Sequence, residues 1–189
     1  MVLDEQYATH YYRGDRKPFQ NLSEVEDGDV DAVLATLAGG SRRRFGPRYL
    51  ALRRATEAKA RDLFIRAGGR PIRTHPHYFV LGPSPWFAGL YDDPQEVRVP
   101  LSELPPEATS FTWTDSITAL GLGTGLGVPQ PPEPSKRALY RLDQLSLATA
   151  DTPLPSSGDA YEGYQQQLVD YYVEIQLWTD DPVAQFVSR

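Results

Sequence analysis

Hydrophobic and polar residues alternate most regularly over residues 172–178, near the end of the chain. The run reads Tyr-Val-Glu-Ile-Gln-Leu-Trp, and its β-branched and aromatic residues favour a strand. Side chains along a strand point alternately to its two faces. One face is therefore expected to place Val173, Ile175 and Leu177 against a core, and the other to carry Tyr172, Glu174, Gln176 and Trp178.

The residues before this run leave two structures open. A continuous helix over 161–178 is one alternative, because helical spacing relates Tyr161, Tyr164, Leu168, Tyr171 and Ile175. The other, which we predict, is a helix that ends near Asp170 and is followed by the strand. The face that carries Glu174 also has two interpretations, the floor of a binding cleft or the solvent side of a half-exposed strand.

Shorter patterns predict further strands in the middle of the chain. His77–Leu81 is a hydrophobic run typical of a buried strand, Glu96–Leu101 alternates, and Ser110–Thr114 is rich in strand formers. An edge strand is predicted over 137–142. A Gly-Pro-Ser-Pro breaker follows the first of these strands, and a helical turn is expected after it, at 86–91.

Two helices are predicted before these strands. A short one begins at Asp29-Val30-Asp31 and stops at Gly39-Gly40, and a longer one begins near Pro47 and stops at Gly68-Gly69. The first 27 residues are polar and aromatic without a clear period, so we predict no element there. The elements together predict an α+β fold, with a small mixed or split β-sheet flanked by helices.

Length and composition predict a single domain over 1–189. The chain has 189 residues, 40% of them hydrophobic, which suffices for one sizeable core. Stretches rich in Gly and Pro predict mobile loops at about 121–136 and 151–159. The N-terminus lacks a signal-peptide pattern, and no stretch is long and apolar enough to cross a membrane, so we expect a cytoplasmic protein. The absence of cysteine excludes disulfides and thiol chemistry.

Positive charge is concentrated in one segment of an acidic protein. Residues 41–73 hold eleven Lys or Arg and two acidic residues, a net of +9, while the rest of the chain carries −15. This basic helix, about 42–73, indicates a surface for nucleic acid or an acidic partner, and the alternative is an ordinary solvated helix face. The candidate anion-binding residues are Arg43, Arg44, Arg48, Arg53, Arg54 and Arg61.

Three other motifs give weaker signals. His75-Pro76-His77 offers two imidazoles, but no third ligand lies near them in sequence, so we predict no metal site. Residues 121–127 are glycine-rich without the spacing of a phosphate loop, and we interpret them as a linker. We interpret Arg13-Gly14-Asp15 as a chance match to an adhesion tripeptide.

Three segments taken in order resemble the DarT group of DNA ADP-ribosyltransferases. The segments are Tyr78 to Trp86, Phe111 to Ser116 and Val173 to Leu177. In that family a strand runs into an Arg-Ser-Pro-Met-Leu-Tyr turn, a Thr-Asp-Gly-Asn element follows, and a closing strand carries the catalytic glutamate. His10, followed by Asn21-Leu22, is similar to the family's N-terminal histidine and Asn-Leu pair.

The resemblance implies an enzyme that consumes NAD. It implies Glu174 as the catalytic carboxylate, a helical arginine near the reacting centre, and His10 near the ribose and phosphates. Tyr78, Trp86 and Trp113 are the candidates for an aromatic side chain against the nicotinamide ring. Cleavage of the nicotinamide–ribose bond develops positive charge on the ribose, which a nearby carboxylate stabilises.

Two functions therefore remain open from the sequence. The first is an ADP-ribosyltransferase-like enzyme that uses NAD and modifies nucleic acid or protein, with single-stranded nucleic acid held along the basic helix. The second is a non-catalytic binding domain whose basic helix docks nucleic acid or an acidic protein. The sequence predicts no oligomeric state.

Overall fold

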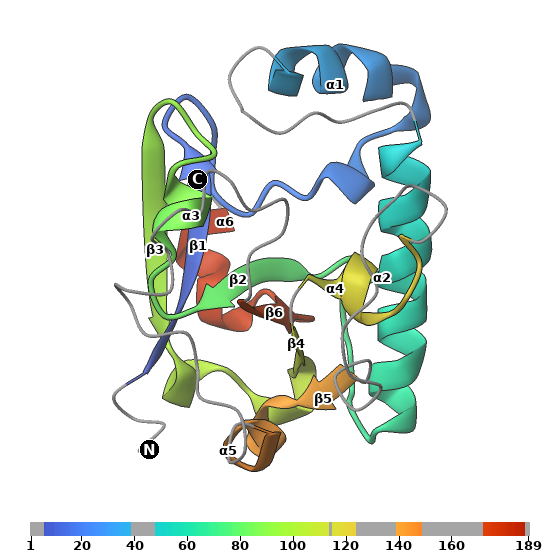
Figure 1. Cartoon of the computed structure of the whole chain (residues 1–189), viewed down its shortest axis with the longest axis vertical. Coiled ribbons are helices and arrows are strands. Elements are labelled where there is room, and N and C mark those ends of the chain that lie inside the picture. The colour runs from blue at the N-terminus through green and yellow to red at the C-terminus, as the bar shows by residue number, and fades with distance from the viewer. Residues whose placement is uncertain (1–5, 39–47, 114, 124–138, 149–171, 188–189) are drawn as a thin grey trace.

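Figure 1 shows the computed structural model of the chain, which describes residues 6–38, 48–113, 115–123, 139–148 and 172–187. Six strands form one sheet in the order β3-β1-β2-β6-β4-β5. The strands are β1 Tyr7–Arg13, β2 His77–Leu81, β3 Pro94–Pro100, β4 Thr109–Trp113, β5 Leu139–Arg141 and β6 Val173–Leu177. All neighbouring strands pair antiparallel. The α+β class is confirmed, but in the part of the chain that the structure describes the sheet is a single open antiparallel one and is neither mixed nor split.

The last strand in sequence lies in the middle of the sheet. β6 pairs with β2 on one side and with β4 on the other. All five of its residues are buried, because both faces of the sheet are covered at this point. The prediction of a strand here is confirmed, and the interpretation of Glu174 as the solvent side of a half-exposed strand is wrong.

The strands predicted in the middle of the chain are confirmed: β2 has the predicted ends, and the ends of the other three move by one or two residues. β5 is an edge strand, as predicted. β1 was not predicted, although it pairs along its whole length with β3 and also with β2. Its aromatic residues and threonine are strand formers, but they occur on both faces, so hydropathy does not alternate.

Two longer helices come from the first third of the chain, and both were predicted. They are α1 Val30–Ala38 and α2 Tyr49–Arg66. α2 runs along one side of the sheet, as Figure 1 shows. Its end is closed by Gly68, whose φ is +88°, and by a bond from the Gly69 N–H to the Phe64 carbonyl oxygen at 2.9 Å. This is the left-handed helix end for which glycine is preferred.

The described residues also form four single-turn α-helices and several short 3-10 helices. The four α-helices are α3 Pro85–Ala88, α4 Ser116–Ala119, α5 Leu145–Ala148 and α6 Ala184–Val187. α3 confirms the helical turn predicted after the Gly-Pro-Ser-Pro breaker. The helix predicted before residue 170 lies outside the described residues, as do the loop at 151–159 and most of the loop at 121–136.

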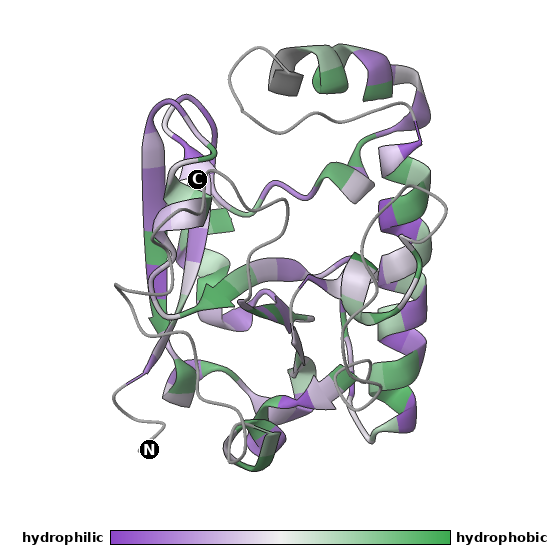
Figure 2. Cartoon of the chain, viewed as in Figure 1, coloured by the Kyte–Doolittle hydropathy of each residue, from purple (hydrophilic) through white to green (hydrophobic). Residues whose placement is uncertain are grey.

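The sheet separates two hydrophobic clusters. The larger lies on the face of Val173, Ile175 and Leu177 and includes Phe79 and Phe111. The smaller lies under α2, where Phe64 stacks on Trp178 with ring centroids 6.2 Å apart. In Figure 2, hydrophobic and hydrophilic residues are mixed along the length of α2. No helix in the described part of the chain is long and apolar enough to cross a membrane.

Candidate functional site

A cavity of about 840 Å³ lies between α2 and the sheet. Its described lining comes from the central strands β2 and β6, from β1, and from the short helices α3 and α4. α2 and the N-terminal segment around residues 19–25 close the other side. Glu174, Tyr78 and Trp86, three of the residues selected from the sequence, line this cavity together.

Glu174 projects from the centre of the sheet and is 9% exposed. Its Oε1 accepts hydrogen bonds from the backbone N–H of Ser116 and from Nε2 of Gln176, both at 3.1 Å. No described residue donates to Oε2. Because Oε1 accepts two hydrogen bonds, the carboxylate has a fixed orientation.

The environment of Glu174 raises the pKa of its carboxyl group toward neutral pH. Burial, followed by the negative charge of Asp115, raises the pKa of Glu174 to about 7 from an ordinary 4.5. The hydrogen bonds from Ser116 and Gln176 and the charge of Arg53 act in the opposite direction. A carboxyl group with this pKa exists in both protonation states near neutral pH, which suits proton transfer.

Arg53 brings the balancing positive charge to the same cavity. It comes from α2, and its guanidinium lies 4.5 Å from the centre of the Tyr78 ring, a cation–π contact. Nε donates to Glu57 at 3.1 Å, Nη1 to the Tyr49 hydroxyl at 3.2 Å and Nη2 to Asn21 at 3.4 Å. Burial opposes its charge, but these neighbours raise the pKa of Arg53 above its ordinary value, so it stays protonated.

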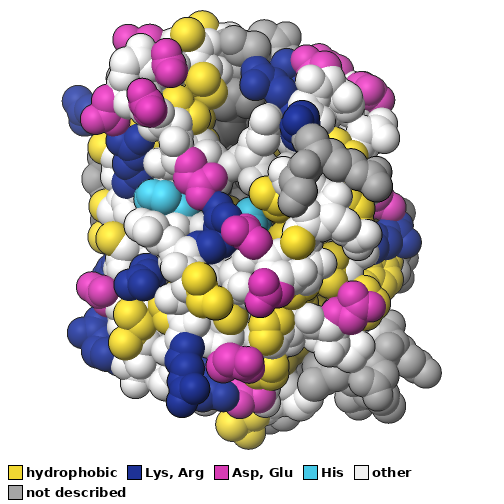
Figure 3. Space-filling view, turned by 180° about the vertical axis from the view of Figure 1, so that it is seen from behind, with side chains coloured by type: hydrophobic (Ala, Val, Ile, Leu, Met, Phe, Trp, Pro, Cys, Tyr) yellow, Lys and Arg dark blue, Asp and Glu magenta, His cyan; other side chains and the backbone are white. Residues whose placement is uncertain are grey.

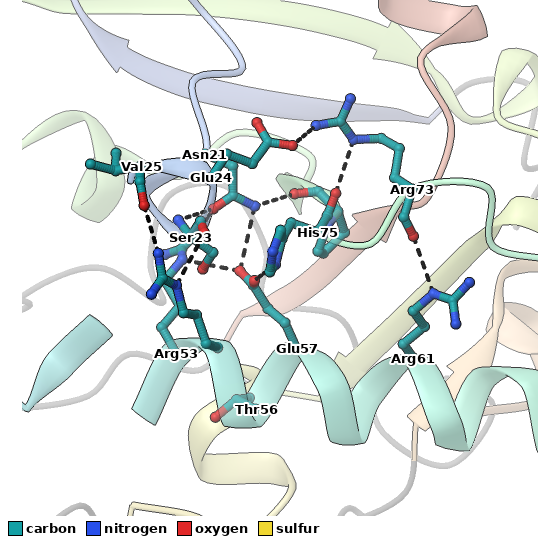
Figure 4. Close-up of polar contacts among 12 residues, drawn as sticks. Asn21, Ser23, Glu24, Val25, Arg53, Thr56, Glu57, Arg61, Arg73 and His75 are labelled. Carbon is teal, nitrogen blue, oxygen red and sulfur yellow. Dashed lines mark hydrogen bonds and ion pairs between the residues drawn. The ribbon is translucent and has the colours of Figure 1, made fainter. Parts of the chain in front are cut away.

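Glu57 fixes Arg53 from one turn further along α2. It is 1% exposed, and Figure 4 shows its carboxylate among groups from three segments of the chain. Oε1 accepts from Arg53 and from the Tyr78 hydroxyl, the latter at 2.9 Å, while Oε2 lies 2.6 Å from Nδ1 of His75. The positive side chain and the hydroxyl therefore reach the cavity in set positions.

Tyr78 keeps its proton in this arrangement. Burial, only partly offset by the charge of Arg53, raises the pKa of the Tyr78 hydroxyl well above its ordinary value, and the nearby carboxylates Glu57 and Glu174 act in the same direction. The hydroxyl therefore acts as a hydrogen-bond donor, and its ring face lies against Arg53. Tyr78 contributes a neutral aromatic surface beside Glu174.

Aromatic rings form another part of the lining. Trp86 stacks on Tyr172 with centroids 6.1 Å apart, and Phe87 meets both rings edge to face at 5.0 and 4.9 Å. Tyr11 of β1 lies beside Phe87, and its hydroxyl accepts the Ser84 N–H at 2.8 Å. The cavity thus combines a charged, hydrogen-bonding part with an aromatic part that can take a flat ring.

His10 also lines the cavity, but its side chain does not share a sheet face with Glu174, and Trp113 is not among the described lining residues. Strand register places Thr9, Val80 and Glu174 on one face of the sheet, so His10 belongs to the opposite face. Its Nδ1 is 2.8 Å from the Tyr78 carbonyl oxygen, and its Nε2 accepts the Phe19 N–H at 3.0 Å.

Both ring nitrogens of His10 are therefore used within the protein. Burial lowers the pKa of His10 to about 4, which keeps the ring neutral. Trp113 is 6% exposed and packs in the larger core cluster. Trp113 occupies an inward position on β4 and not a cavity position, whereas His10 lines the cavity from the sheet face opposite Glu174.

Cations of the basic helix mostly bind the protein itself. Arg54 donates to the carbonyl oxygens of Ser23 and Val25, and Arg61 donates to those of Arg73 and Pro71. Arg48 is exposed at the start of α2, while Arg43 and Arg44 lie outside the described residues. On the face in Figure 3, Lys and Arg are interspersed with Asp and Glu. The described part of the basic helix thus offers few cations to an external anion.

The weaker motifs have structural roles or lie apart. Nδ1 of His75 contacts Glu57, whereas Nε2 of His77 contacts Asp180 at 2.7 Å, so the two imidazoles do not converge. Arg13 is paired with Asp15 in the turn after β1. The glycine-rich linker lies mostly outside the described residues.

Sequence reasoning missed the polar partners of the site. Arg53 was one of several equivalent arginines, and Glu57 was counted only as a charge. The signal available for both was their spacing of four residues, which places them on one face of a helix. Tyr172 was placed on the correct face of β6 but was not identified as a lining residue. A scan against protein-family models and searches of curated proteins and of solved structures found no match to this chain.

Proposed function

We propose that this protein is an ADP-ribosyltransferase-like enzyme that cleaves the nicotinamide–ribose bond of NAD and transfers the ADP-ribose to nucleic acid or protein. The observation that carries the proposal is Glu174, a buried carboxylate with one oxygen held by two donors, in a cavity that also contains Arg53 and aromatic rings. The resemblance to the DarT group supports the same assignment.

The charges of the cavity suit a positively charged transition state. As the C–N bond breaks, nicotinamide leaves with the bonding electron pair and positive charge develops on the ribose. A fixed carboxylate close to that ring stabilises the charge without having to reorient. An acceptor hydroxyl, amine or water then bonds to the ribose carbon and loses a proton, for which Glu174 is a suitable base.

Arg53 suits the diphosphate of the same substrate. A guanidinium has five N–H groups, and three of those of Arg53 are used by Glu57, Tyr49 and Asn21 in the described part of the chain. The remaining two match a phosphate oxygen pair, with which arginine forms charge-assisted bonds. Among the helical arginines, Arg53 is therefore our candidate for the one that the family resemblance implies.

The aromatic part of the lining suits the leaving group. Trp86, which is partly exposed and stacks on the buried Tyr172, offers a flat apolar surface, and nicotinamide is a flat ring that stacks on such surfaces. The alternative of a binding domain that uses the basic helix has less support, because Arg54 and Arg61 are already bound to backbone carbonyl oxygens.

Nicotinamide release from NAD by the purified protein tests the proposal. It should be measured with and without single-stranded DNA, for the wild type and for Glu174→Gln. We expect the variant to lose at least 10²- to 10³-fold in turnover, roughly the cost of removing one preorganised electrostatic group, while it still binds NAD. Exposed Glu103 in Glu103→Gln is the matched control and should keep wild-type turnover.

Two results would contradict the proposal. Equal turnover in Glu174→Gln would remove that residue from the site. A wild-type protein that neither releases nicotinamide nor binds NAD in calorimetry would exclude the activity itself.

A further inference from the structure

Gln176, which donates a hydrogen bond to Glu174, is itself oriented by a series of buried hydrogen bonds that we call the hydrogen-bond chain. Trp178 Nε1 donates to Ser110 Oγ at 2.9 Å, and Ser110 Oγ donates to Gln176 Oε1 at 2.8 Å. Gln176 Nε2 lies 3.1 Å from both Thr112 Oγ1 and Glu174 Oε1, and 3.4 Å from the Glu174 carbonyl oxygen. All residues of the hydrogen-bond chain except Glu174 are fully buried.

Strand register explains why these residues meet. Ser110 lies directly opposite Gln176, and Thr112 directly opposite Glu174, across β4 and β6. Residues opposite one another in an antiparallel pair share a face of the sheet. Trp178 follows on the same face, one position beyond β6, so the bonds run parallel to the sheet toward Glu174.

Trp178, at the end of the hydrogen-bond chain farthest from Glu174, determines which groups donate and which accept. The indole of Trp178 can only donate, so Ser110 accepts from it and has its own proton for Gln176 Oε1. If the Gln176 amide were turned over, the Ser110 proton would lose its acceptor and the amide oxygen would face the Glu174 carboxylate. Both changes are costly for fully buried groups. The amide therefore presents its N–H groups to Glu174.

We propose that Gln176 is a positioning residue, oriented by Trp178 and Ser110, that fixes the rotamer of Glu174 and stabilises its ionised form. The kinetic consequence of this inference rests on the proposed function. The effect on the carboxylate itself does not, because it concerns the affinity of Glu174 for a proton.

Other charged groups also act on Glu174, and they must stay constant in the test. Asp115, at the start of α4, opposes ionisation, whereas Arg53 of α2 favours it. Tyr78 of β2 is neutral and faces the same cavity. The hydrogen-bond chain from Trp178 reaches Glu174 along the sheet and includes none of these three groups. Its residues can therefore be substituted while Asp115, Arg53 and Tyr78 are kept.

The test is a carboxyl titration by NMR on protein labelled with ¹³C in glutamate. The Glu174 signal is identified as the one missing from Glu174→Gln. Gln176→Leu removes the donor at similar volume and should raise the pKa of Glu174 by about one pH unit, the size expected for one hydrogen bond to a charged group. Ser110→Ala leaves the amide in place but removes the group that orients it, so it should give a smaller rise in the same direction.

Thr109→Val is the matched control. Thr109 is adjacent to Ser110 and fully buried, but it faces the other side of β4, and its hydroxyl has no partner among the described residues. This variant should leave the Glu174 titration unchanged. In the two test variants, the acidic limb of the pH profile of nicotinamide release should move by the same amount as the titration.

The outcomes separate this inference from the proposed function. An unchanged Glu174 pKa in Gln176→Leu would overturn the role of Gln176, and an unchanged value in Ser110→Ala alone would overturn its orientation by Trp178 and Ser110. A protein without NAD turnover would contradict the proposed function, but its Glu174 signal would still decide whether Gln176 acts as inferred.

Discussion

Glu174 is ionised only at a cost to the folded state, because burial raises its pKa to about 7 from 4.5. Between these two values the folded protein binds more protons than the unfolded chain. The free energy of unfolding therefore falls as the pH rises through this window. The Glu174 contribution is favourable below about pH 4.5 and fully lost above about pH 7.

Glu174→Gln should remove this pH dependence. The free energy of unfolding of the variant minus that of the wild type should increase by on the order of 3 kcal/mol between pH 4.5 and pH 8. Urea denaturation at several pH values measures the difference, and comparison between pH values cancels any constant effect of the substitution. Wild-type and variant curves that run parallel would contradict a raised pKa. Glu103→Gln should follow the wild type.

Glu174 could be selected from the sequence because alternation in β6 is a local pattern. Its partners could not, because they come from far along the chain. Ser116 lies 58 positions away, and Ser110 lies 66 positions from Gln176. His10 illustrates a different limit of the sequence. Its residue type suggests chemistry, but pairing between strands places it on the other face of the sheet, and only the fold shows this.

At the scale of elements, arginine side chains as well as apolar contacts hold α2 to its neighbours. Arg54 donates to two carbonyl oxygens of the segment before α1 and also pairs with Asp27. Arg61 holds the loop after α2 in the same way. Carbonyl oxygens in such irregular segments need donors that the local backbone does not supply.

Arg54→Ala should therefore act on stability. We expect the free energy of unfolding to fall by roughly 1–2 kcal/mol, because two backbone acceptors lose a charged donor that is itself partly exposed. Hydrogen exchange should become faster in residues 22–29. Arg66→Ala, an exposed position on the same helix, should cost about 0.5 kcal/mol or less. Equal effects of the two substitutions would show that Arg54 is only a surface charge.

Most elements could be predicted because each has a local signature. β2 is a hydrophobic run, and α2 ends at a Gly-Gly pair that permits a left-handed residue. β1 has no such signature. Its seven residues are mixed in polarity and become a strand because β3 pairs with every one of them.

At the scale of the whole molecule, β6 joins the two halves of the sheet. β3, β1 and β2 lie on one side of it, and β4 and β5 on the other. Ile175 is fully buried and lies opposite both Phe79 and Phe111, one from each half. The two halves should consequently unfold together.

Ile175→Ala should reduce the free energy of unfolding by roughly 3–5 kcal/mol, the cost of a cavity in a packed core. Far-ultraviolet circular dichroism and tryptophan fluorescence should report the same transition, because the sheet unfolds as one unit. Val187→Ala, at a position that is 40% exposed, should cost less than about 1 kcal/mol. Separate transitions for the two probes would contradict a single cooperative unit.

The central position of β6 also has a consequence for biosynthesis. A chain is made from its N-terminus, and domains can begin to fold during synthesis. Until β6 emerges, β2 and β4 have no strand between them, and the cavity lacks Glu174. The strand that completes the sheet thus also delivers the carboxylate, so a partly made chain has neither the finished fold nor the complete site.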